Sequence, residues 1–167
     1  MPLSAVVSST ILSTSSVPAT LRTCACNNLA SIYKYKQKYK EAESNFKKSI
    51  ELDSSIPEPC NNLGNLYVYL NKYDEGIHYY NKALNINPKF FIAHYNLGVA
   101  FKAIGKIEEA KKHLRESVRI NPLFCTGHRN LSIINKYKKD DEHFKILKEI
   151  INKSEINNPE KSELAFA

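Results

Sequence analysis

The sequence predicts an all-α fold, an alpha-alpha superhelix (a helical solenoid) built from helix-turn-helix units of 34 residues. The first observation is a dipeptide, Asn-Leu, that recurs at steps of 34 residues and begins at Asn28, Asn62, Asn96 and Asn130. The second is that the apolar residues within a unit recur at the spacing of one helix face. The third is that proline closes two of the units, at Pro88 and Pro122. A fixed period of this length is typical of stacked helical repeats.

Three regular units span residues 23–56, 57–90 and 91–124. In the first unit, residues at i, i+3, i+4 and i+7 mark the buried face of a first helix: Cys26, Leu29, Ala30 and Tyr33. A second helix follows, and its buried face is marked by Ala42, Phe46, Ser49 and Ile50. One helix pair cannot bury its apolar face alone, so we expect neighbouring pairs to stack.

A tight turn is predicted between the two helices of a unit. It is clearest at Leu70-Asn71-Lys72 and at Ile104-Gly105-Lys106. Asn and Gly tolerate the left-handed backbone conformation that commonly ends a helix.

The fourth unit, residues 125–153, is degenerate. Asn135 stands where an aromatic residue is expected, and Phe144 stands where a small one is expected. A helix is still predicted over 141–153, capped by Asp140 or Asp141. Its apolar face comprises Phe144, Leu147, Ile150 and Ile151.

The two ends of the chain differ from the repeats. Residues 159–167 read as a partial helix that runs into an apolar end, so we expect a fragment of a longer array. Residues 1–22 are rich in Ser and Thr and are expected to form a flexible leader. A cleaved export signal is the alternative, although the first basic residue, Arg22, follows the apolar stretch rather than preceding it.

Further positions repeat with the same period. A small residue follows each Asn-Leu: Ala30, Gly64, Gly98 and Ser132. Aromatic residues recur at Tyr33, Tyr67 and Phe101, and small ones at Ala42, Gly76 and Ala110. Large apolar residues recur at Phe46, Tyr80 and Leu114. This pattern resembles the tetratricopeptide repeat (TPR) family over residues 23–167, which implies a right-handed superhelix with a concave groove and a role as a protein-binding scaffold.

The face of each first helix opposite the core is expected to line that groove. There Asn28, Asn62, Asn96 and Asn130 would form a ladder, similar to the asparagine ladder of O-linked N-acetylglucosamine transferases. An Asn side chain offers both a donor and an acceptor, so it can hold the backbone of an extended peptide. The alternative is structural, with each Asn tying one helix to the next.

Other polar and aromatic residues share this face. They are Asn65, Lys34, Lys102, Lys136, Arg129, Tyr35, Tyr69 and Tyr137. Together they favour a protein or peptide partner that is acidic or ends in a carboxylate. The alternative is a solvated helix face, and the carboxylate-clamp pattern of chaperone-binding TPR proteins is incomplete here.

Composition excludes several kinds of partner and site. The net charge of +7 is diffuse and no nucleic-acid signature occurs, so no nucleic acid is expected as a partner. No segment is long and apolar enough to span a membrane. Four cysteines lack the spacing of a zinc site, which favours free thiols and a cytoplasmic location, with zinc binding as the minority alternative.

No catalytic, metal or cofactor motif is recognised, and the five histidines are interpreted as packing residues. The chain is therefore not expected to be an enzyme. As an alternative, the segment from His128 to His143 resembles the repeats that precede a sulfotransferase domain in some bacterial proteins, and glycosyltransferases also follow such arrays. The chain would then be a non-catalytic accessory region. Self-association through the C-terminal helix is a third possibility.

Overall fold

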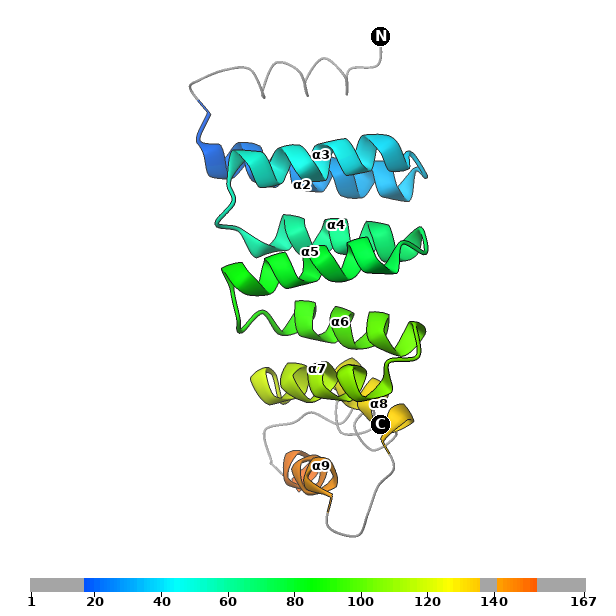
Figure 1. Ribbon diagram of the computed structural model, residues 1–167. Coiled ribbons are helices and arrows are strands. Elements are labelled where there is room, and N and C mark those ends of the chain that lie inside the picture. The colour runs from blue at the N-terminus through cyan, green and yellow to red at the C-terminus, as the bar shows by residue number, and fades with distance from the viewer. Residues whose placement is uncertain (1–16, 136–140, 153–167) are drawn as a thin grey trace. The chain divides into compact units, whose positions relative to one another are not determined.

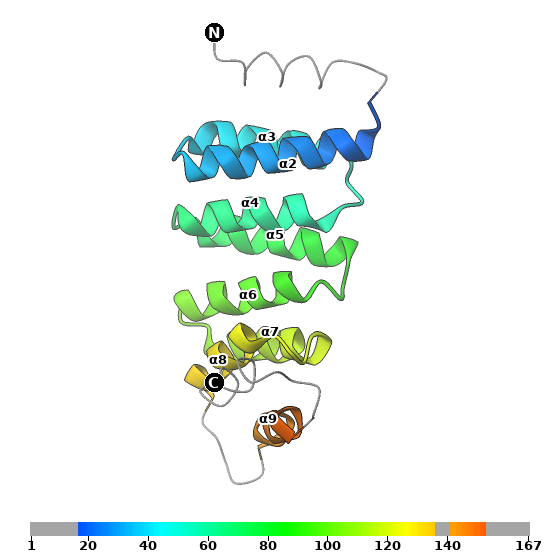
Figure 2. The same ribbon diagram turned by 180° about the vertical axis from the view of Figure 1, so that it is seen from behind.

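The computed structural model describes residues 17–135 and 141–152, which form eight helices and no strand. The chain divides into two compact units, residues 1–87 and 88–167, and each is described by itself. Helices follow one another as pairs joined by short turns, and Figures 1 and 2 show each pair from its two sides. The predicted all-α fold of repeated helix pairs is confirmed.

Unit 1 contains two complete pairs. Helix α2 (Ala19–Tyr35) pairs with α3 (Tyr39–Leu52), and α4 (Pro57–Tyr69) pairs with α5 (Tyr73–Ile86). Proline suits the first turn of α4, because the backbone N–H that it lacks has no partner within a helix at that position.

The core of unit 1 draws on three successive helices. Its buried residues are Ala30, Ala42, Phe46, Leu63, Leu66 and Tyr67. They come from α2, α3 and α4, so the apolar face of one pair is covered partly by the next pair, as the repeat predicts.

Small residues allow the helices of a pair to approach closely. A Cβ atom at Gly64 would lie 2.6 Å from Cε1 of Tyr80, and one at Gly76 would lie 2.5 Å from Cγ2 of Val68. Neither position has room for a side chain unless a neighbour moves. The recurring small residues therefore set the distance between α4 and α5.

The turn within each regular pair has one residue in the left-handed conformation. These residues are Gln37, Asn71 and Gly105, with φ of 59°, 60° and 81°. In all three turns the N–H of the following residue donates a 2.9 Å hydrogen bond to the carbonyl five residues earlier. This closure is the Schellman type, which satisfies a helix-end carbonyl, and the two predicted turns are confirmed.

Unit 2 contains α6 (Phe91–Ala103), α7 (Ile107–Ile120), α8 (Cys125–Ile134) and α9 (Glu142–Asn152). One buried cluster, from α7 and α8, holds Leu114, Val118 and Leu131. A second holds Leu147 and Ile150 of α9, packed against Cys125.

The fourth pair departs from the regular ones. Helix α8 has 10 residues against 13 in α4 and α6, and it ends just before Asn135. Asp141 caps the start of α9, since its Oδ1 accepts the backbone N–H of His143 at 2.9 Å. Phe144 is 45% exposed, with the Lys148 ammonium 4.7 Å above its ring, so its predicted place on the buried face was wrong. α9 packs through Leu147 and Ile150, which turns Phe144 toward solvent.

The described structure differs from the sequence prediction at the N-terminal end of the repeats. Helix α2 begins at Ala19, directly after Pro18, and so takes in residues that the sequence assigned to the leader, whereas the regular unit was predicted from Thr23. Residues 1–16 and the predicted partial helix over 159–167 lie outside the described residues. Among the described helices, none has the length and apolar character needed to cross a membrane.

Candidate functional site

The first helices of unit 1 carry the predicted groove residues Asn28 and Asn62. Asn28 is exposed on α2, whereas Asn62 is half-buried on α4. The amide nitrogen of Asn62 donates a 3.0 Å hydrogen bond to Oδ1 of Asn27, so the neighbour of Asn28 makes the contact between the helices. The Asn27–Asn28 tandem is the only signal in the sequence for this contact, and it did not indicate which of the two residues would turn toward α4.

Asn65, also predicted on this face, is bound by its own helix pair. Its Oδ1 accepts a 2.8 Å hydrogen bond from the hydroxyl of Tyr80. Tyr80 is 2% exposed, and burial raises the pKa of its hydroxyl above the ordinary value. Asn65 therefore satisfies a buried donor and ties α4 to α5.

Lys34, Tyr35 and Tyr69 come together at one end of α2 and α4. The Lys34 ammonium lies 5.7 Å from the centre of the Tyr69 ring, and Tyr35 is 89% exposed. With Ser31 and Gln37 they line an open depression of about 340 Å³. The hydroxyls of Tyr69 and Tyr39 lie 3.4 Å apart, which holds the Tyr69 ring beside α3.

The half-buried position of Lys34 has an electrostatic consequence. Burial lowers the pKa of its ammonium, and the nearby Tyr69 opposes that effect. An ammonium that has lost part of its hydration beside an aromatic ring is stabilised by an arriving carboxylate. This end of unit 1 is therefore suited to an anionic group.

Unit 2 holds a second polar cluster, centred on Asn130 of α8. The Lys102 ammonium donates to its Oδ1 at 3.0 Å. The amide nitrogen of Asn130 donates to the Tyr95 hydroxyl at 3.2 Å and to the Thr126 carbonyl at 3.1 Å. Asn130 thus uses its oxygen and both amide hydrogens within the protein, and its main effect is to position Lys102.

The other predicted residues of unit 2 surround this cluster or lie beyond it. Asn96 is half-buried on α6 and Arg129 is exposed on α8. Arg129 is close enough to Tyr95 to offset part of the rise that burial causes in the pKa of the tyrosine. Lys136 and Tyr137 lie outside the described residues.

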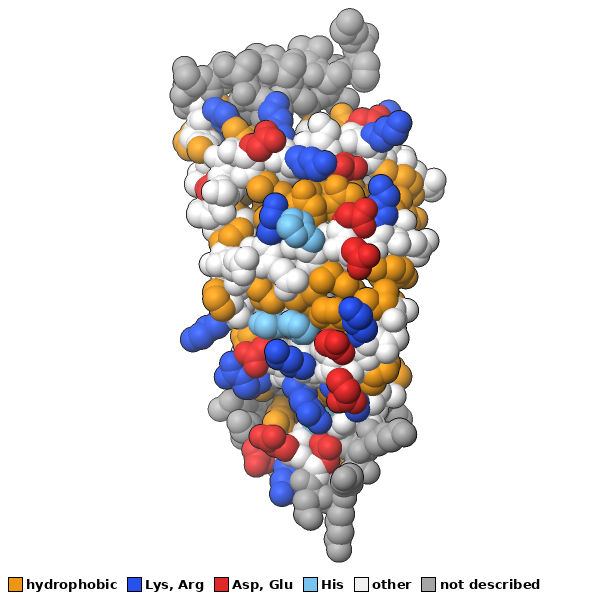
Figure 3. Space-filling model, viewed as in Figure 1, with side chains coloured by type: hydrophobic (Ala, Val, Ile, Leu, Met, Phe, Trp, Pro, Cys, Tyr) orange, Lys and Arg blue, Asp and Glu red, His pale blue; other side chains and the backbone are white. Residues whose placement is uncertain are grey.

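The second helices present a different kind of surface. Figure 3 shows Lys and Arg side chains interspersed with Asp and Glu side chains on the visible face. Each ion pair among the described residues joins two residues of the same second helix, α3 for Lys47–Glu43 and α7 for Lys111–Glu108 and Arg119–Glu116. Two second-helix lysines, Lys82 and Lys148, also lie over aromatic rings of their own helices, those of Tyr79 and Phe144. On the first helices, Lys34 contacts the Tyr69 ring and Lys102 contacts the Asn130 amide.

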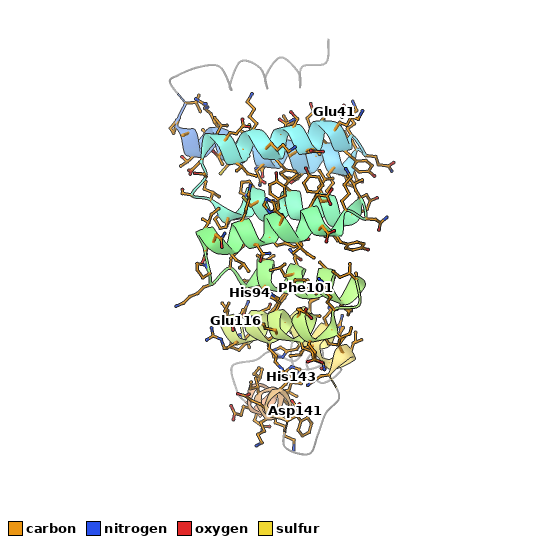
Figure 4. All side chains as sticks on the ribbon, viewed as in Figure 1. Glu41, His94, Phe101, Glu116, Asp141 and His143 are labelled. Atoms are coloured by element: carbon orange, nitrogen blue, oxygen red, sulfur yellow. The ribbon has the colours of Figure 1, made fainter. Side chains whose placement is uncertain are left out.

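Four of the five histidines, which the sequence analysis interpreted as packing residues, form two pairs in unit 2. Nδ1 of His94 lies 3.1 Å from Nδ1 of His113, and Nδ1 of His128 lies 2.8 Å from Nε2 of His143. Figure 4 labels His94, Phe101 and Glu116 around the first pair and His143 and Asp141 at the second. Within the described part of the chain, no group of three His, Cys, Asp or Glu residues is arranged to hold a metal ion.

None of the four cysteines forms a disulfide. Cys26 and Cys60 are buried, Cys125 is half-buried and Cys24 is exposed. Burial raises the pKa of the Cys26 and Cys60 thiols, so these two thiols are protonated packing groups at neutral pH.

Comparison with known proteins identifies the repeats. A TPR repeat model matches residues 64–105, and two tetratricopeptide repeat models match residues 25–56 and 91–124. Together the three matches span more than half of the 167 residues. No curated protein matches the sequence.

Among solved structures, the chain is similar to the first TPR domain of human RPAP3, with 25% identity and a TM-score of 0.64 over 67% of this chain and 88% of that one. It is similar to the first TPR of Spaghetti (RPAP3) bound to the HSP90 peptide SRMEEVD, with 24% identity and a TM-score of 0.65 over 69% and 91%. The second TPR domain of human RPAP3, in complex with the HSP70 peptide SGPTIEEVD, has 20% identity and a TM-score of 0.65 over 72% and 100%.

Proposed function

Because the chain belongs to the tetratricopeptide repeat family, we propose that it is a protein-interaction scaffold that binds an extended acidic peptide and catalyses no reaction. The family is one of interaction modules, and two of the similar structures hold peptides. Both of those peptides contain two Glu residues and end in Asp. For this chain, the acidic character of the partner is inferred from the surroundings of Lys34.

The observation that carries the proposal is the environment of Lys34. Its ammonium is half-buried over the Tyr69 ring, in an open depression that Tyr35 borders. A carboxylate of the peptide would pair there with the partly desolvated Lys34 ammonium, and an adjacent apolar side chain would pack against the exposed ring of Tyr35. An acidic residue beside an apolar one fits this depression.

The predicted asparagine ladder separates into two roles under this proposal. Asn28 is exposed, and Asn62 retains one amide hydrogen beyond the one donated to Asn27, so both are available to a peptide backbone. Asn130 is saturated by its contacts within unit 2 and acts by holding Lys102 in place. Lys102 and Arg129 would then be the basic contacts that unit 2 offers by itself.

A reducing compartment such as the cytoplasm fits four cysteines that form no disulfide. The alternative role as an accessory region of a sulfotransferase or glycosyltransferase stays a prediction of the sequence, and so does self-association through the C-terminal segment. No contact among the described residues favours either over peptide binding.

The test is binding to a synthetic array of short extended peptides, each made in an acidic version and in a matched version with Gln for Glu and Asn for Asp. We expect binders among the acidic versions, and weaker binding of their amide counterparts. Affinities of the selected peptides are then measured by fluorescence anisotropy.

Lys34→Ala should lower the affinity for the selected peptides by about tenfold, as expected for the loss of one partly buried charge-assisted hydrogen bond. The matched control is Lys47→Ala, which removes the same charge from unit 1 but lies on α3 in an ion pair with Glu43. Equal binding of acidic and amide peptides, or equal effects of the two substitutions, would contradict the proposal.

A further inference from the structure

His128 and His143 form a buried pair that joins α8 to α9. The two rings stack, with their centres 5.1 Å apart and their planes at 6°. The side chains are 0% and 4% exposed, and the two ring nitrogens lie 2.8 Å apart. This contact does not depend on the proposed peptide-binding faces, which use other residues.

The hydrogen bonds of His128 fix where the protons of the pair lie. Nε2 of His128 lies 2.8 Å from the carbonyl oxygen of Pro122, which can only accept, so this nitrogen carries hydrogen. In the neutral ring Nδ1 of His128 must then accept, and Nε2 of His143 donates to it. If both rings were protonated, two N–H groups would face each other and the hydrogen bond would be lost.

The surroundings oppose a positive charge on this pair. Arg115 and Arg119 of α7 line the same depression as His143, of about 210 Å³, together with Asp141 and Glu142 at the start of α9. Burial, the neighbouring His128 and Arg115 lower the pKa of His143 to about 4, although Asp141 acts in the opposite direction. Burial also lowers the pKa of His128, partly offset by its bond to Pro122.

Helix α9 has a small apolar contact with the rest of unit 2. Its buried residues besides His143 are Leu147 and Ile150, which pack against Cys125. The other histidine pair, His94–His113, lies between helices that interlock closely, since a Cβ at Gly98 would lie 2.6 Å from Cγ of Leu114. Losing a histidine contact therefore matters far more for the docking of α9 than for the α6–α7 pair.

We propose that the His128–His143 pair is an acid-sensitive latch, in which protonation of both rings releases α9 from α8 and uncovers the apolar surface beneath it. That surface includes Val118 and Leu131 of α7 and α8, which line the depression under α9. Unit 1 lacks the device, because Cys26 and Cys60 occupy the repeat positions of His94 and His128. It therefore serves as a control within the same chain.

The experiment is hydrogen–deuterium exchange of the full chain, read by mass spectrometry, between about pH 7 and about pH 5, after correction for the intrinsic effect of pH on exchange. We expect the amides of α9 to exchange about tenfold or more faster at the lower pH, while α4 and α5 stay unchanged. No change in α9, or equal changes in both units, would overturn the latch.

A variant separates the latch from general acid weakening. His143→Gln places an amide nitrogen where Nε2 lies, so it keeps the donor to His128 but does not titrate. In this variant the release of α9 should move to lower pH or disappear. The matched control is His78→Gln, the same change at an exposed histidine of unit 1, which should leave the release unchanged. Release of α9 at the same pH in the wild type and in His143→Gln would also overturn the proposal.

Discussion

The three left-handed turn residues show how one position of the repeat tolerates different side chains at different cost. Gly105 has no steric penalty at φ 81°, and Asn71 has a small one at φ 60°. Gln37 adopts φ 59° although its longer side chain gains nothing from that conformation. The first turn is therefore the strained one of the three.

Gln37→Gly should raise the free energy of unfolding of unit 1 by about 0.5–1 kcal/mol, because Gly adopts a positive φ without strain. Urea denaturation followed by circular dichroism measures it. Asn71→Gly is the matched control and should give a smaller gain. A loss of stability in Gln37→Gly would mean that the Gln37 side chain itself holds the end of α2.

The contact of Asn65 with Tyr80 gives a second prediction for a single residue. Asn65→Ala leaves the buried Tyr80 hydroxyl without its acceptor, which should cost about 1–2 kcal/mol of stability. In a Tyr80→Phe background the same substitution should cost much less, and a double-mutant cycle measures the difference. If the two costs are equal, the hydrogen bond to Tyr80 does not stabilise the fold, and Asn65 is again a candidate peptide-binding residue.

At the scale of helices, the sequence predicted those features that depend on local spacing. The starts of α4, α6 and α8 at Pro57, Phe91 and Cys125 coincide with the predicted unit boundaries. The turns at Asn71 and Gly105 also follow from residue type, because few residues adopt a positive φ.

The features that the sequence did not predict depend on how one helix is rotated against another. The 34-residue period indicated a ladder through Asn28, whereas the α2–α4 contact uses Asn27. His113 and His143 stand at different repeat positions, so no period relates them, yet each meets a histidine of the preceding helix. Such contacts follow from the packing of helices and not from spacing along one helix.

The small residues at the crossing of two paired helices give a prediction at this scale. Gly98→Ala places a methyl group 2.6 Å from Cγ of Leu114, so α6 and α7 must separate or Leu114 must change its rotamer. The expected cost is about 1–3 kcal/mol, measured by thermal denaturation. Combining it with Leu114→Ala should cost less than the sum of the two single changes. An additive result would mean that the helices adjust without strain.

At the scale of the whole chain, the titrating groups differ between the two units. The histidines with a lowered pKa, His113, His128 and His143, all belong to unit 2. Unit 1 has His78 on its surface. Lowered histidine pKa values mean that the folded state binds fewer protons than the unfolded state, so their stability contribution is present above pH 6.5 and is lost as the pH falls toward about 4.

His113 allows this dependence to be measured apart from the release of α9. Burial, His94 and Lys112 lower its pKa to about 4, and Glu116 opposes them. The chain contains no tryptophan, so Phe91→Trp reports on unit 2 and Tyr33→Trp reports on unit 1. Between about pH 7 and about pH 5, the unit 2 reporter should show a loss on the order of 1–2 kcal/mol and the unit 1 reporter little change. His113→Asn keeps a nitrogen near Nδ1 but does not titrate, so it should flatten the response at the unit 2 reporter. If both reporters fall together, acid acts on groups common to both units, and the histidine pairs do not set the acid limit of unit 2.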